Sequence, residues 1–180
     1  MKKIFLSLFA MSSFGLYAQK TIHVFNYTNF NLVNTLLGAD QTNSSCFPSI
    51  QGTNYPIPVP PQGIAQYKGY KDSNIPLPAA PQSPPINAWD VTFAVNNVIY
   101  QMPANSNVLG PLALSTDWML NKFYVADPGG GPLLNSGASI GTIGCNGQLV
   151  THLQNTSSTP YAFNDAFWFV SAGETYFVIQ

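Results

Sequence analysis

The sequence predicts an all-β fold, a two-layer antiparallel β-sandwich of about eight to ten short strands, with a β-barrel as the alternative. Short segments of alternating apolar and polar residues recur along the chain, which is typical of strands. No stretch of twelve residues has the three-and-four apolar spacing of an amphipathic helix, and 14 glycines and 15 prolines interrupt the chain repeatedly. We therefore expect little helix.

The first 18 residues have the layout of a bacterial Sec-type signal peptide. Lys2 and Lys3 precede an apolar run over residues 4–16, and the small residue Ala18 follows. The run is shorter than the roughly 20 residues that a membrane-spanning helix needs, and no later segment reaches that length. We expect a secreted or periplasmic protein, with one sandwich domain over residues 19–180 and no transmembrane segment in the mature chain.

The first strands follow directly, over residues 20–26 and 29–38. The clearest alternation comes later, over residues 88–95, and Asn96-Asn97 is a candidate tight turn that returns the chain through residues 98–102. Four side chains of this segment should face the core: Trp89, Val91, Phe93 and Val95.

The remaining strands are expected in the second half of the chain. Residues 121–127 form one, residues 137–153 form two around Asn146-Gly147, and residues 166–179 form a hairpin. Weaker candidates lie at 64–70 and 109–114.

The chain contains two cysteines, Cys46 and Cys145. In an exported protein an even number of cysteines favours a disulfide, and two cysteines with two scattered histidines lack the spacing of a zinc site. We predict a Cys46–Cys145 disulfide, and no metal or other cofactor.

Nine prolines lie between Pro56 and Pro85. Because the predicted disulfide encloses them, residues 55–86 should be a long loop within the domain, not a linker. The hairpin at 166–179 is apolar on both faces, and a two-layer sandwich buries only the inner one. We predict that the loop covers the outer face, with Ile57, Val59, Ile75 and Leu77 packed against it. The rival is a bare face that binds a partner.

Composition excludes some functions. Without the leader the chain has four lysines, no arginine and seven acidic residues, a formal charge of about −3, so it has no basic patch for nucleic acid. No nucleophile elbow, phosphate-binding glycine loop or zinc-protease motif occurs. His23 and His152 lie within expected strands, and no acid pair stands out. We expect a protein that is not an enzyme.

The most distinctive feature of the composition is the number of aromatic residues that lie next to Asn or Gln in the sequence. Tyr55, Tyr67 and Tyr70 lie in or near the proline-rich loop, where their rings either cover the core or stack on a sugar. We predict a binding or surface-interaction module whose partner is an extracellular glycan or a protein. The sequence does not determine its oligomeric state. The alternatives are an oligomerising or membrane-active sandwich, and a hydrolase with an acid pair.

Overall fold

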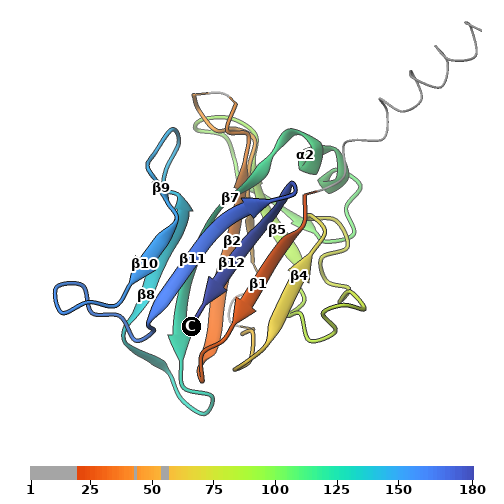
Figure 1. The fold of residues 1–180 in the computed structure, drawn as a ribbon. Coiled ribbons are helices and arrows are strands. Elements are labelled where there is room, and N and C mark those ends of the chain that lie inside the picture. Colours follow the sequence, from red (N-terminus) through yellow and green to blue (C-terminus); the bar gives the residue numbers. More distant parts are fainter. Residues whose placement is uncertain (1–19, 43, 54–56) are drawn as a thin grey trace, which may run out of the picture.

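The computed structural model describes residues 20–42, 44–53 and 57–180. Within these ranges twelve strands form two sheets, and a single short helix lies at one end (Figure 1). The two sheets face each other and are not closed into a barrel. The predicted β-sandwich is therefore confirmed. No helix among the described residues has both the length and the apolar character needed to cross a membrane.

One sheet has five strands in the order β10-β11-β12-β1-β4. Their bounds are β10 (His152–Gln154), β11 (Asp165–Ser171), β12 (Glu174–Ile179), β1 (Ile22–Asn26) and β4 (Ile64–Tyr67). Strands β11 and β12 form the predicted hairpin, whose turn has positive φ at Ala172 and Gly173, as a tight two-residue turn requires. β1 runs parallel to β12, whereas the other pairs in this sheet are antiparallel.

The other sheet has seven strands in the order β6-β5-β3-β2-β7-β8-β9, and all its pairs are antiparallel. Their bounds are β6 (Tyr100–Pro103), β5 (Ala88–Thr92), β3 (Ser49–Gly52), β2 (Asn31–Ala39), β7 (Asp117–Ala126), β8 (Pro132–Thr142) and β9 (Leu149–Val150). The inner faces of both sheets meet in one apolar core. At its centre the Tyr70 ring packs edge-on against Trp89 and Trp118, with ring centroids 5.0 Å and 4.9 Å away.

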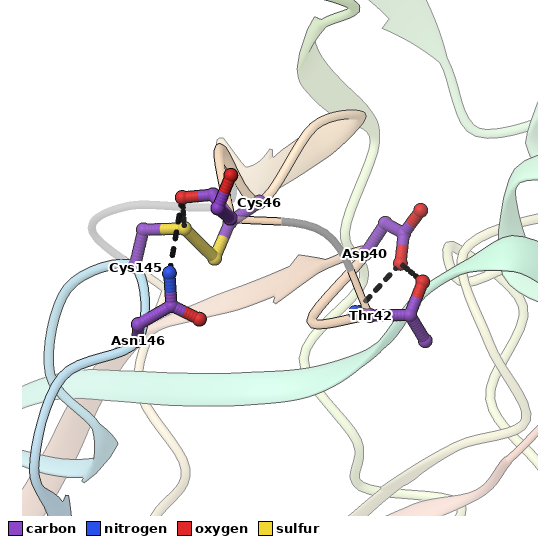
Figure 2. Close-up of a disulfide and its surroundings, with 6 residues drawn as sticks. Asp40, Thr42, Cys46, Cys145 and Asn146 are labelled. Atoms are coloured by element: carbon purple, nitrogen blue, oxygen red, sulfur yellow. Dashed lines mark hydrogen bonds between the residues drawn. A yellow bond between two sulfur atoms is a disulfide. The ribbon is translucent and has the colours of Figure 1, made fainter.

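The predicted disulfide is confirmed. Cys46 and Cys145 are bonded, so the loop between β2 and β3 is joined to the loop between β8 and β9 (Figure 2). The Asn146 side-chain amide donates a hydrogen bond to the Ser44 carbonyl at 3.1 Å, which adds a second link between the same loops. At the start of the first loop, the Asp40 carboxylate accepts hydrogen bonds from the backbone and hydroxyl of Thr42 (Figure 2).

The predicted core face of β5 is only half right. Trp89 and Val91 are fully buried, but Phe93 and Val95 are exposed. The strand ends at Thr92, whose partner Ser49 is the first residue of β3, so no β3 residue pairs with the chain beyond that point. The predicted turn is displaced by one residue: the Asn97 N–H donates to the Ala94 carbonyl, so Val95 and Asn96 are the central residues, and Asn96 has the positive φ. The chain then returns as β6, as predicted.

The weak strand candidate at 109–114 is wrong, because this segment forms helix α2 (Leu109–Ser115). Leu109, Leu112 and Ala113 are buried on one side of the helix, at the spacing of an amphipathic turn. Pro111 lies in the first turn, where the missing backbone N–H costs no helical hydrogen bond.

The predicted cover over the outer face of the β11–β12 hairpin is also wrong. Part of the proline-rich stretch is β4, which pairs with β1 at the sheet edge, and Val59 bridges to Leu32 of the other sheet. Ile86 and Val59 are buried, but Ile57 and Ile75 are exposed. The stretch therefore closes the side of the sandwich next to β4 and does not lie over β11 and β12 (Figure 1).

Candidate functional site

The side of the sandwich opposite β4 has a chain crossing between the two sheets. Val150 of β9 pairs with Gly141 in the seven-stranded sheet, whereas His152 of β10 pairs with Phe167 in the five-stranded sheet. The chain therefore passes from one sheet to the other between Val150 and His152. Because β10 begins only at His152, the second half of β11 has no strand beside it on this edge.

A cleft of about 770 Å³ opens beside this exposed half of β11. Its floor includes the buried rings of Trp118 and Trp168, and its rim includes the exposed side chains of Leu149 and Val170. The disulfide-linked loops and the strand ends next to them supply Gln41 and Thr142. The lining is mostly apolar with a few polar groups, which is the usual composition of a small-molecule site.

Phe169 presents an aromatic ring face to this cleft. On the outer face of the five-stranded sheet the rings of Phe169, Tyr176 and His23 stack in a row, with centroids 5.0 Å and 4.6 Å apart and planes within 6° of parallel. These distances match the spacing between neighbouring strands, so the rings stand side by side on the sheet. No described residue is recorded as stacking on Phe169 from the β10 side. One face of Phe169 is therefore covered by Tyr176, and the other is turned to the cleft; the side chain is 45% exposed.

The backbone of β11 adds hydrogen-bonding groups beside that ring. The Trp168 N–H donates to the Thr151 carbonyl at 2.9 Å, across the β10 side of the strand. Backbone groups two residues apart in a strand point the same way, so the N–H and carbonyl of Val170 face the same edge. Among the described residues no strand pairs with β11 there, and Val170 is exposed.

The charged groups around the cleft are paired. Lys20 forms an ion pair with Asp117 at the rim, and its backbone carbonyl accepts the Trp118 indole N–H at 2.7 Å. His152 is hydrogen-bonded to Asp165 at 2.7 Å and stacks on Phe167. The site therefore offers hydroxyl, amide and backbone groups without a strong net charge.

A second histidine and carboxylate pair lies at the far end of the ring row. His23 Nε2 is 2.9 Å from Glu174 Oε2, and the Tyr176 hydroxyl donates to the same carboxylate oxygen at 3.2 Å. The hydrogen bond from His23 is the main cause that lowers the pKa of Glu174. Partial burial and the hydrogen bond to Glu174 raise the pKa of Tyr176. These contacts hold the row in position behind Phe169.

The predicted ligand residues lie elsewhere. Tyr67 and Tyr70 are each 2% exposed, and their hydroxyls bond to the Pro84 carbonyl and to Thr116. Burial raises the pKa of both phenols, as expected for core side chains. These two rings cover the core, the other role that the sequence allowed them, and we do not place them in the site. Tyr55 lies outside the described residues.

Sequence reasoning missed the residues of the cleft, although one signal pointed toward them. The hairpin at 166–179 is apolar on both faces, and its outer rings are those of the row that ends at Phe169. Within the described ranges no cluster of three or more His, Cys, Asp or Glu side chains could hold a metal ion. Comparisons with protein families, with curated proteins and with solved structures found no match.

Proposed function

We propose that this protein is a non-enzymatic extracellular binding module, and that a neutral sugar unit of a glycan binds in the cleft beside β11. The observation that carries this proposal is the uncovered face of Phe169 at the wall of the cleft. A pyranose has an apolar C–H face and a polar rim, so it complements a flat ring surrounded by hydrogen-bonding groups.

The groups around Phe169 suit the hydroxyls of a sugar. The backbone of Val170 supplies one donor and one acceptor, and Thr151 and Gln41 add hydroxyl and amide groups within the same cleft. The sole cation among the lining residues, Lys20, is paired with Asp117. A phosphorylated or acidic ligand would need an unpaired cation, so a neutral glycan fits better.

Substitutions at Phe169 test the proposal directly. We expect Phe169→Leu to lower the affinity for the bound glycan at least tenfold, because it keeps an apolar side chain but removes the ring face. Phe169→Tyr should retain binding. Pull-down on cellulose, chitin and xylan and a neutral-oligosaccharide array identify a ligand, and intrinsic fluorescence then measures affinity, since Trp118 and Trp168 line the cleft.

The matched control is Leu134→Ala, which removes an exposed aliphatic side chain from β8 outside the cleft. It should bind as the wild type does. Equal affinity of Phe169→Leu and wild type for a glycan would contradict the stacking role. Binding of an extended peptide in place of any glycan would assign the Val170 edge to strand addition and overturn the proposal.

A further inference from the structure

The loop between β5 and β6 carries aliphatic side chains into solvent at one end of the sandwich. Val95, Val98 and Ile99 are 60%, 66% and 63% exposed. The loop contains a turn that spans residues 94–97, closed by the Asn97 N–H, which donates to the Ala94 carbonyl at 3.1 Å. Val95 lies within this turn, and Val98 and Ile99 follow it. The Asn97 side-chain oxygen accepts the Val98 N–H at 2.8 Å, so this backbone donor is already hydrogen-bonded within the loop. We name residues 93–100 the apical loop.

The apolar surface continues from the apical loop onto helix α2. A shallow hollow of about 460 Å³ separates them, and its lining is Phe93, Asn107, Val108, Pro111, Leu112 and Ser115. Val108 in this lining is exposed, and so is Leu114 of α2. The apical loop and α2 thus form one apolar surface built from two neighbouring segments.

This surface carries no charge of its own. Between Asp90 and Asp117 the chain has no Lys, Arg, Asp or Glu. One lysine contacts this surface: the Lys71 ammonium donates to the Asn107 side chain at 3.0 Å. An anionic lipid surface is normally met by a cluster of basic residues, and a single lysine does not make one.

We propose that the apical loop and α2 dock on the surface of a zwitterionic lipid bilayer, with Val95, Val98 and Ile99 at the boundary between headgroups and acyl chains. The side-chain types favour lipid over a protein partner. Protein interfaces rely on Tyr, Trp and Arg, whereas Leu and Val are under-represented among their energetically important residues. An uncharged aliphatic surface suits the acyl boundary.

An aromatic pair lies at the base of the apical loop. Phe93 and Tyr100, the first and last residues of the loop, pack edge to face, with ring centroids 5.8 Å apart. Phe93 directly follows β5 and Tyr100 is the first residue of β6, so both rings lie at the base of the loop. In the proposed orientation they would lie nearer the headgroups than Val95 at the turn. Aromatic side chains are enriched at that level of a membrane. This inference does not depend on the sugar cleft.

Vesicle flotation of the purified protein tests the inference. We expect the wild type to float with phosphatidylcholine vesicles, and the double variant V98D/I99D to have a partition coefficient at least tenfold lower. Both positions are exposed, so the fold should survive, and near-ultraviolet circular dichroism checks this. The matched control is Leu134→Asp, an exposed aliphatic position on β8 away from the apical loop, which should float as the wild type does.

A second measurement reports contact at the loop itself. Ile99→Trp should show a blue-shifted emission on adding the vesicles, relative to the wild-type spectrum. Failure of the wild type to float at millimolar lipid, or flotation of V98D/I99D equal to wild type, would overturn the proposal. A lipid-free dimer that V98D/I99D dissociates would also overturn it, in favour of a second copy of the chain as the occupant.

Discussion

The two edges of the five-stranded sheet differ in how they end. At the β4 edge the proline-rich stretch turns inward, and Val59, Tyr67, Tyr70 and Ile86 are buried in the core. At the β10 edge the chain crosses between the sheets within two residues and leaves half of β11 beside a cleft. One edge is therefore closed by the chain itself, and the other stays accessible to a ligand.

Hydrogen bonding explains why the β4 edge can be closed. The Asn26 side chain is fully buried, and its Nδ2 lies 2.8–3.1 Å from the carbonyl oxygens of Phe30, Val59 and Pro60. Its Oδ1 accepts the backbone and hydroxyl of Thr28. Buried backbone groups need such partners, because leaving one unpaired costs about 1–3 kcal/mol. At the other edge, no described strand pairs with β11 beside Val170.

Removing the disulfide should have the largest effect on this comparison. Cys46 and Cys145 are 99 residues apart, and loss of a constraint of that length lowers the free energy of unfolding by about 4–5 kcal/mol. Urea denaturation of C46S/C145S measures this. Because Cys145 precedes the crossing segment, ligand affinity at the cleft should fall as well. Unchanged stability of the double variant would show that the open edge is held without the disulfide.

Asn26→Asp tests the closed edge with almost no change in shape. A carboxylate would face three carbonyl oxygens and lose both amide donors, so we expect the free energy of unfolding to fall by about 3–4 kcal/mol at neutral pH. The control is Asn29→Asp, an exposed position in the same turn, which should have little effect. If both variants melt alike, the Asn26 hydrogen bonds do not hold this edge together.

The smallest effect is expected at the outer ring row. His23 lowers the folded-state pKa of Glu174, so the pair stabilises the protein above the ordinary value of about 4.5, and this contribution is lost as pH falls through the lowered pKa. Glu174→Gln should melt about 1–3 °C below wild type at pH 7, because exposed pairs contribute little. Thermal melts between about pH 7 and pH 2.5 should converge at the acidic end. A gap that persists there would mean that the carboxylate charge is not responsible.

Much of the fold could be read from the local pattern of residues. The alternation in residues 20–26 and 166–179, and the turn residues at Ala172 and Gly173, predict strands and a hairpin because these signals act between near neighbours in the chain. The disulfide could also be predicted, because the chain contains only two cysteines. Local pattern failed at Phe93 and Val95, which keep the alternation but extend past the end of the neighbouring strand β3.

The sequence by itself thus determined most of the strand-forming segments, though not β3 or the helix α2, together with the disulfide and the absence of a basic surface. Only the tertiary structure decided which strands are neighbours, and with them the position of the cleft. Phe169, Tyr176 and His23 form one row because β12 lies between β11 and β1, a pairing between the last and first strands of the described chain. Side-chain periodicity records which face a residue occupies, but strand order depends on the summed packing of the whole core, which no short segment contains.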